Sequence, residues 1–272
     1  MSLLILAVLL AGLLTWLLRE PLFTRWRRAR IRARPFPAAW REILRHRVPY
    51  FRTLPADLQL QLKKHIQVFL AEKPVVGCDG LEITDEMRVV IAAHACLLLL
   101  NRRTDVFPNL TQVLVYPGRF LVKREVTDGI GLARQEERVL SGESWSHGQV
   151  ILSWDDVQEA ASNPDSGRNV VVHEFAHQLD QEDGSANGAP FMRGRARRSR
   201  WAEVMSAEFQ TLQSRVFGDE PSLIDPYGAT NPAEFFAVVS EVFFGRPREL
   251  ADTHPRLYAE LSAFYRLNPL SW

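Results

Sequence analysis

The residues most capable of chemistry lie in one short run, His173-Glu174-Phe175-Ala176-His177. Two histidines four positions apart project from one face of a helix about 6 Å apart, so both imidazoles can bind a single Zn²⁺. Glu174 follows the first histidine, where its carboxylate can reach a metal-bound water without binding the metal. The run predicts a hydrolytic zinc site with His173 and His177 as ligands and Glu174 as the general base.

The pattern has only three fixed positions, so coincidence is the alternative. Its surroundings favour the metal site. Val171, Val172, Phe175 and Leu179 make most of the helix surface apolar, which predicts a buried helix. Histidine and glutamate side chains inside such a helix would face a large desolvation cost unless they were paired or bound to metal.

A catalytic zinc needs a third protein ligand, and three residues compete for this role. Asp183 stands where a longer zinc motif places its third ligand, but Asp180 replaces the glycine that would let the chain turn there. Glu234 and Glu241 lie seven residues apart on one face of a predicted helix that Asn231 caps. Glu234 could instead bond the backbone at Asn231 in a capping box. Spacing does not decide between the two glutamates.

The elements around these motifs predict a helix-rich α+β fold with a small β-sheet. Apolar residues recur at helical spacing in residues 55–72 and 83–100. Strand-like runs occupy residues 112–116, 120–123 and 149–154. We expect these elements, with the two helices that carry the site residues, to form one domain.

The N-terminus is a separate feature, because Leu3 to Leu18 is apolar and uncharged. As a helix it would span roughly 24 to 27 Å, just short of the ~30 Å hydrocarbon core. Seven arginines lie between residues 19 and 34, and the positive-inside rule keeps such a cluster in the cytoplasm. We predict an inner-membrane anchor with the catalytic domain in the cytoplasm, or a cytoplasmic protein if the segment does not span.

A cleaved signal peptide is one alternative, but it expects basic residues before the apolar run and a small-residue cleavage site after it. An amphipathic or buried segment is the other. Residues 21–50 are basic, and Pro35, Pro37 and Pro49 predict a helix-poor linker with one short amphipathic helix at residues 40–45. The predicted organisation is therefore a hydrophobic anchor at 1–20, the linker at 21–50 and a peptidase domain at 51–272.

Composition narrows the choice of partners. The chain of 272 residues is 46% hydrophobic and carries a net charge of +1, so it has no global attraction to nucleic acid. Five arginines between Arg193 and Arg200 predict an exposed loop entering a helix, with a partner-binding patch as the alternative. Because no aromatic residues are interleaved to stack on bases, we expect no nucleic-acid partner.

Three motifs together resemble the Mlc titration factor A family. They are His-Glu-Phe-Ala-His-Gln-Leu-Asp at 173–180, Ile-Asp-Pro-Tyr-Gly-Ala at 224–229, and Asn-Pro-Ala-Glu-Phe-Phe-Ala-Val-Val-Ser-Glu-Val-Phe-Phe at 231–244. The resemblance covers roughly residues 55–270. The N-terminal apolar segment and the arginine run lie outside it.

The resemblance implies a zincin-like metallopeptidase whose zinc ligands are His173, His177 and Glu234, with Glu174 as base and Tyr227 near the reacting carbonyl. It favours Glu234 over Glu241, and the active site is similar to that of the anthrax lethal factor catalytic domain. It also implies aminopeptidase-like activity on a peptide or protein substrate, and a transcriptional repressor similar to Mlc as a partner.

Two supporting roles and one rival function complete these predictions. Asp180, one turn beyond His177, could accept the free imidazole N–H of a ligand, and Glu241 could act comparably. The rival is a regulatory binding protein that keeps a zinc site and sequesters a repressor. The presence of Glu174 favours catalysis, since a purely structural zinc site does not need it.

Overall fold

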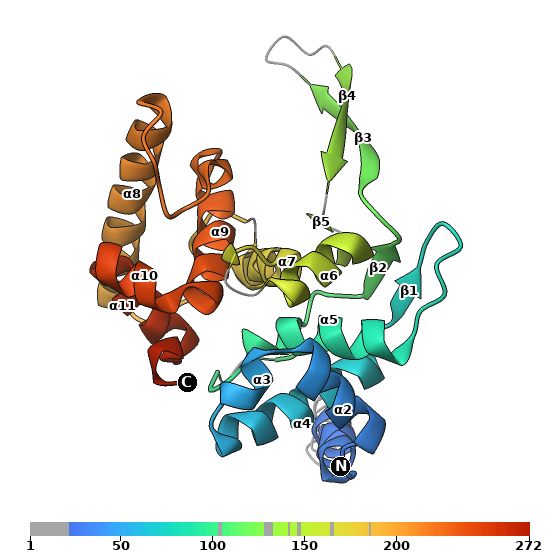
Figure 1. The fold of residues 1–272 in the computed structure, drawn as a ribbon. Coiled ribbons are helices and arrows are strands. Elements are labelled where there is room, and N and C mark those ends of the chain that lie inside the picture. Colours follow the sequence, from blue (N-terminus) through green and yellow to red (C-terminus); the bar gives the residue numbers. More distant parts are fainter. Residues whose placement is uncertain are drawn as a thin grey trace, which may run out of the picture.

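The computed structural model describes residues 22–102, 105–127, 133–140, 142–145, 148–163, 166–184 and 186–272 (Figure 1). Residues 3–18, for which the sequence predicts an anchor, lie outside these ranges. Within them, no helix is both long enough and apolar enough to cross a bilayer.

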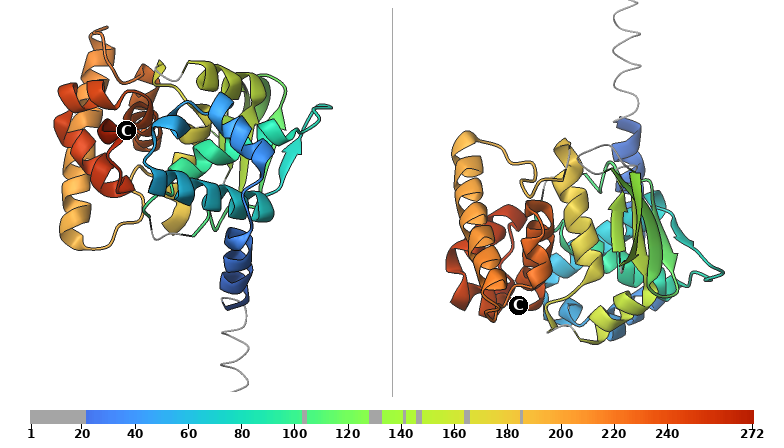
Figure 2. Two further views of the ribbon diagram at one scale, coloured as in Figure 1. Left: turned by 60° about the horizontal axis from the view of Figure 1, so that its bottom comes forward. Right: turned by 90° about the horizontal axis from the view of Figure 1, so that it is seen from above.

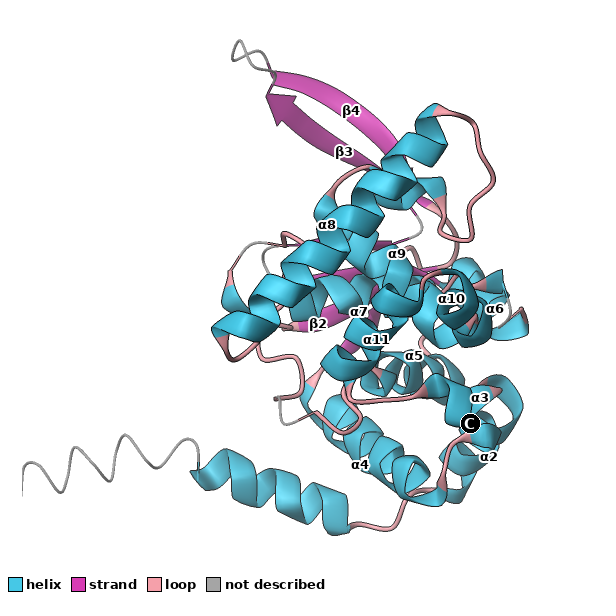
Figure 3. Ribbon diagram, turned by 90° about the vertical axis from the view of Figure 1, so that its left-hand side faces the viewer, coloured by secondary structure: helices cyan, strands magenta, loops and turns pink. Residues whose placement is uncertain are grey.

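The N-terminal third is helical and packs beneath the sheet. Residues 22–33 form a helix, which Figure 3 draws at the lower left, beyond α4. Four further helices follow: α2 (Ala38–Arg47), α3 (Tyr50–Thr53), α4 (Ala56–Glu72) and α5 (Asp85–Leu97). Thr84 caps α5, its hydroxyl accepting a hydrogen bond from the Met87 amide at 3.2 Å.

The prediction of a helix-poor linker at residues 21–50 is wrong. Helices occupy most of that range, and Leu44 and Val48 are fully buried in the core. The reason lies in where the prolines fall. Pro37 and Pro49 occupy the N-cap positions of α2 and α3, where the missing amide hydrogen breaks no helical bond, so they start helices instead of interrupting them.

A four-stranded sheet forms the middle of the molecule, in the order β1-β2-β6-β5. Strands β1, β2 and β6 are parallel, and β5 runs antiparallel along the edge beside β6. A separate antiparallel hairpin of β3 and β4 projects from the body (Figure 1). The strands are β1 (Val75–Gly77), β2 (Gln112–Tyr116), β3 (Phe120–Thr127), β4 (Ala133–Leu140), β5 (Gly142–Trp145) and β6 (Gln149–Ser153).

The remaining elements are helices, and α7 lies between the sheet and the C-terminal helices (Figure 2). They are α6 (Trp154–Ser162), α7 (Val170–Asp180), α8 (Arg195–Phe217), α9 (Pro232–Gly245), α10 (Pro247–Thr253) and α11 (Pro255–Tyr265), with 3-10 turns η2 (Gln181–Asp183), η3 (Pro226–Ala229) and η4 (Pro269–Ser271). The helix-rich α+β architecture with a small sheet is confirmed.

Aromatic contacts fix α7 against its neighbours. Phe175 of α7 lies 4.7 Å, centroid to centroid, from Phe107 and 5.7 Å from Phe69 of α4. Trp201 of α8 contacts Phe236 of α9 at 5.7 Å. Rings at these separations bury large apolar areas and hold α7 and α9 rigidly, so the polar side chains they carry have fixed positions.

The arginine run enters α8, which begins at Arg195. Two of its side chains are bound to α11: Arg200 pairs with Glu260 at 2.6 Å, and the Arg197 guanidinium donates to the Ala263 carbonyl at 2.5 Å. These two arginines therefore contribute to packing between α8 and α11.

Candidate metal centre

The two histidines are positioned by a capped, buried helix. Asn169 begins α7, and its side-chain oxygen accepts a hydrogen bond from the Val172 amide at 3.0 Å. Val171, Phe175 and other apolar residues bury the rest of α7 in the core, so His173 and His177 share its one polar stripe. Both histidines therefore face α9.

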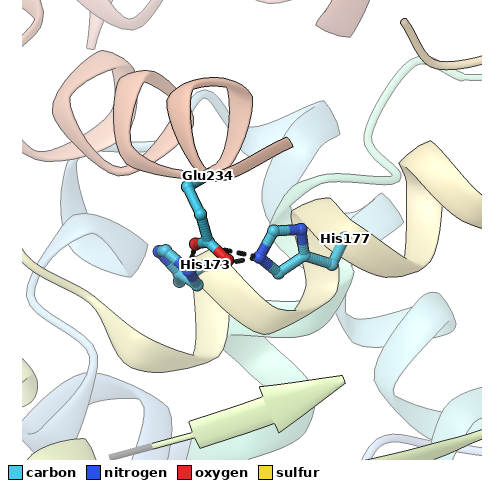
Figure 4. A group of neighbouring side chains, drawn as sticks. All are labelled: His173, His177 and Glu234. Carbon is cyan, nitrogen blue, oxygen red and sulfur yellow. Dashed lines mark hydrogen bonds and ion pairs between the residues drawn. The ribbon is translucent and has the colours of Figure 1, made fainter. Parts of the chain in front are cut away.

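Glu234 comes from the first turn of α9. Asn231 caps this helix by accepting a hydrogen bond from the Glu234 amide at 3.0 Å, and Pro232 occupies the first position. The Glu234 carboxylate does not return to the Asn231 backbone as a capping box would require. It points at the histidines instead (Figure 4).

The three side chains converge with the spacing that a tetrahedral ion needs. The Glu234 Oε2 atom lies 3.0 Å from His173 Nε2 and 3.4 Å from His177 Nε2, and the two nitrogens are 3.2 Å apart. Bonds of ~2.0–2.1 Å at tetrahedral angles place adjacent ligand atoms about 3.3 Å apart. The donor set and its geometry therefore fit a zinc-type ion, and three positions filled by protein would leave one open.

Glu241 holds the far side of His173. Its Oε1 atom lies 2.7 Å from His173 Nδ1, and its Oε2 atom accepts a hydrogen bond from the Asn169 amide. A carboxylate accepts hydrogen bonds, so this contact favours a proton on Nδ1, and Nε2 is then the ring nitrogen that would bind a metal ion in place of its own proton. The seven-residue spacing thus puts one glutamate on each nitrogen of the same ring.

The charges in this cluster are strongly coupled. Burial opposes ionisation of Glu234, but hydrogen bonds with His173 and His177 outweigh it and hold the pKa of this carboxyl well below its ordinary value. Burial lowers the pKa of His173, but the two glutamates reverse this and raise it well above the usual range. The cluster therefore concentrates negative charge where a cation would sit.

Glu174 is in a different environment. Its side chain is buried, and its Oε2 atom has no hydrogen-bond partner within the described ranges. Burial raises the pKa of Glu174 to about 7, against the attraction of the two neighbouring histidines. A carboxylate with a pKa near neutrality can both accept and return a proton at physiological pH.

The site opens into a pocket of about 430 Å³, lined by His173, Glu174 and Tyr227 among others. Tyr227 is 45% exposed, and its ring centroid lies 6.0 Å from that of His173. The Asp225 carboxylate accepts a hydrogen bond from the Tyr227 amide at 2.9 Å and is also paired with Arg168. This pairing fixes the turn that carries Tyr227 at the mouth of the pocket.

Two other predicted residues lie elsewhere. Asp183 is exposed in η2 and does not join the histidines. The proposed role of Asp180 is wrong in its partner, because its Oδ2 atom accepts from the Gly188 amide at 2.7 Å and no hydrogen bond joins it to a histidine in the described part of the chain. The chain turns back at Gly188 and its backbone amide binds one oxygen of the carboxylate, while Asp180 Oδ1 and His177 Nδ1 have no hydrogen-bond partner among the described residues.

Sequence reasoning missed the support behind Glu241. The side-chain Nδ2 atom of Asn169 lies 2.9 Å from Nδ1 of His94, a buried residue of α5. Asn169 could have been found from its N-cap position before an apolar run. His94 could not, because it is 75 residues away and nothing in its local sequence marks it as polar support.

Comparison with known proteins gives the family. The model for the glucose-regulated metallo-peptidase M90 family matches residues 23–266, most of the chain. The chain belongs to the M90 metallopeptidase family. This enzyme is 41% identical over 268 residues to the protein slr2042 of Synechocystis sp., covering 98% of this chain and 97% of the relative.

Two further relatives carry the name Mlc titration factor A. The M90 enzyme is 36% identical to the protein from Enterobacter sp., over 85% of this chain and 86% of the relative. It is 37% identical to the protein from Klebsiella pneumoniae, over 82% of this chain and 84% of the relative. The resemblance drawn from the three sequence motifs is thereby confirmed. The family match begins at residue 23, within the predicted linker.

Proposed function

We propose that this M90 metallopeptidase is a zinc-dependent, zincin-like peptidase that binds zinc through His173, His177 and Glu234. The single observation that carries the proposal is the 3.0–3.4 Å separation of one carboxylate oxygen and two imidazole nitrogens. Two histidines and one glutamate are a recurring ligand set for catalytic zinc. When bound, zinc polarises the substrate carbonyl and lowers the pKa of a water ligand toward ~7.

Glu174 is the proposed general base. It accepts the proton of the attacking water and later gives it to the leaving amine. Its burial and its pKa near 7 support both transfers. Tyr227 is the proposed donor to the developing oxyanion, supported by its position beside His173 at the pocket mouth. Glu241 keeps the His173 imidazole in the required tautomer.

The substrate is a peptide or protein, and we propose aminopeptidase-like specificity. Such specificity needs a carboxylate near the metal to hold the free α-amine. Three acidic residues line the pocket besides Glu174 and Glu241. Asp156 and Asp225 are each paired with an arginine, and Glu159 is exposed with no ion pair to a described residue. Glu159 is therefore our candidate for the amine-binding group.

A partner similar to the repressor Mlc is proposed from the names of the relatives. They also favour a second candidate function, a regulatory binding protein that sequesters a repressor and keeps a zinc site. For location we propose the inner membrane, with residues 3–18 as anchor and the catalytic domain in the cytoplasm, supported by the apolar run and the arginines after it.

Glu174→Gln separates these functions. If the protein is a peptidase, this variant keeps zinc and loses about 10²-fold or more of its hydrolysis of peptide amides, because general base catalysis is removed while the ligands stay. Glu203→Gln, an exposed glutamate on α8, is the matched control. Equal hydrolysis by Glu174→Gln and wild type would overturn the base assignment. Zinc-loaded wild type without hydrolysis, but with repressor binding, would favour sequestration.

A further inference from the structure

The helix at residues 22–33 has two faces of different chemistry. Its docked face carries Arg28 and Ile31. Arg28 makes a bidentate ion pair with Glu72 of α4, with N–O distances of 2.9 and 2.7 Å, and also contacts Asp105. Ile31 packs against the core. The helix is thus clamped to the domain in a defined orientation.

The opposite face is apolar and exposed. Leu22 is 58% exposed, Phe23 59% and Trp26 55%. At 100° per residue these three side chains lie within one sector of about 100°, roughly opposite Arg28 and Ile31. In a globular domain, the apolar face of a surface helix normally packs against the core. In this helix the apolar sector faces outward.

Arginines border this sector. Arg25 and Arg32 are exposed and lie along one side of it, Arg27 lies along the other, and the Arg30 guanidinium stacks over Trp26 at 4.8 Å from the ring centroid. A helix with aromatic residues on one face and arginines around it is typical of segments that lie in the interface of an anionic bilayer.

A single exposed apolar residue would need no explanation. Phe217, at the end of α8, is 96% exposed, and with Val216 (41% exposed) it forms an apolar pair that has no second aromatic ring and no group of arginines around it. The helix at 22–33 differs in both respects. It also follows the apolar run at residues 3–18 after only three residues, so any membrane contact by that run brings this face to the bilayer surface.

We propose that Leu22, Phe23 and Trp26 insert into the interfacial region of an anionic bilayer, and that the neighbouring arginines bind its phosphate headgroups. The surface is independent of the proposed catalytic function, and it requires contact at the interface whether or not residues 3–18 span. Because Arg28 clamps the helix to Glu72, this contact also sets how the peptidase domain faces the membrane.

The test uses an environment-sensitive fluorophore on the full chain. In a Cys78→Ser background, which leaves only the buried Cys96, the label is placed at Phe23→Cys or at the control Phe217→Cys. We expect a blue shift and protection from an aqueous quencher at position 23 with phosphatidylglycerol vesicles, and neither change at position 217. A label at position 23 that stays as quenchable as that at 217 would overturn the proposal. So would protection without vesicles that rises with protein concentration, because a second copy would then cover the face.

Charge variants separate headgroup binding from apolar insertion alone. Replacing Arg25, Arg30 and Arg32 with glutamine should lower the affinity for anionic vesicles, measured from protection at position 23, by roughly fivefold per arginine. It should also remove the preference for anionic over phosphatidylcholine vesicles. Glutamine at Arg193, Arg195 and Arg248 removes the same charge elsewhere and should change nothing. Equal effects of the two sets would refute the headgroup contact. An unchanged circular dichroism spectrum and thermal unfolding midpoint confirm that each variant is folded.

Discussion

Glu241→Gln tests how the second carboxylate supports the site. In the wild type both Glu241 oxygens accept hydrogen bonds, one from His173 Nδ1 and one from the Asn169 amide. A glutamine side chain keeps the shape but has one acceptor and one donor group. The Asn169 amide can only donate, so it will take the remaining oxygen. The new NH₂ group then faces His173 Nδ1 and favours the tautomer with its proton on Nε2.

The size of the effect follows from this conflict. A proton on Nε2 blocks the nitrogen that faces His177 and Glu234, so metal binding must either reverse the tautomer or leave a backbone amide without an acceptor. Losing that hydrogen bond costs about 1–3 kcal/mol. Removing such a support of a metal ligand typically lowers affinity 10–100-fold, which is about 1.4–2.7 kcal/mol. We therefore expect zinc affinity to fall 10–100-fold, with the fold intact.

Competition with a chromophoric zinc chelator measures this affinity. The chain offers a matched control, because the Glu208 carboxylate contacts His254 Nδ1 at 2.7 Å and neither residue belongs to the cluster. Glu208→Gln disturbs the same kind of contact and should leave zinc affinity unchanged. If Glu241→Gln binds zinc within twofold of wild type, or if Glu208→Gln weakens it equally, the tautomer argument is refuted.

Three further changes have defined outcomes. Tyr227→Phe should lower kcat about 10²–10³-fold with zinc content unchanged, as measured by steady-state kinetics; normal kcat would remove Tyr227 from the oxyanion site. Burial lowers the pKa of His94 to about 4, so its contribution to stability is present above pH ~6.5 and is lost as the pH falls. Urea unfolding of wild type should therefore lose about 2 kcal/mol more between pH 7 and 5 than that of His94→Gln, and equal losses would contradict this. A Cβ on Gly188 (φ 76°) would stand 2.3 Å from a backbone oxygen in the first turn of α9, so Gly188→Ala should lower both Tm and zinc affinity. Gly80→Ala, at φ 77° with no atom within 4 Å, controls for backbone strain and should leave zinc affinity unchanged.

Much of the site could be predicted because its signals are local. The four-residue spacing of His173 and His177 puts both rings on one helical face, and Asn231 with Pro232 marks the start of the helix that carries Glu234. The choice between Glu234 and Glu241 was not local. It depends on how α9 crosses α7, and the motif resemblance favoured Glu234 where spacing could not decide.

The parts that sequence reasoning missed depend on tertiary contacts. Asp180 lies one turn from His177, yet it binds the Gly188 amide because the loop after η2 folds back. Residues 22–33 were predicted as part of a linker because arginines and prolines surround them. The helix is held in place by the ion pair between Arg28 and Glu72, which lies 44 residues further along the chain. Neither contact follows from the periodic pattern of apolar residues, which is what predicts helices and strands from a sequence.

A zinc-edge anomalous diffraction map of the zinc-loaded protein would locate the ion among its proposed ligands. We expect one strong peak about 2.0–2.3 Å from His173 Nε2, His177 Nε2 and a Glu234 oxygen, with Glu241 bound to His173 Nδ1 and not to the metal. A peak on Glu241 in place of Glu234, or no peak at the two histidines of a protein that hydrolyses peptides, would contradict this ligand set.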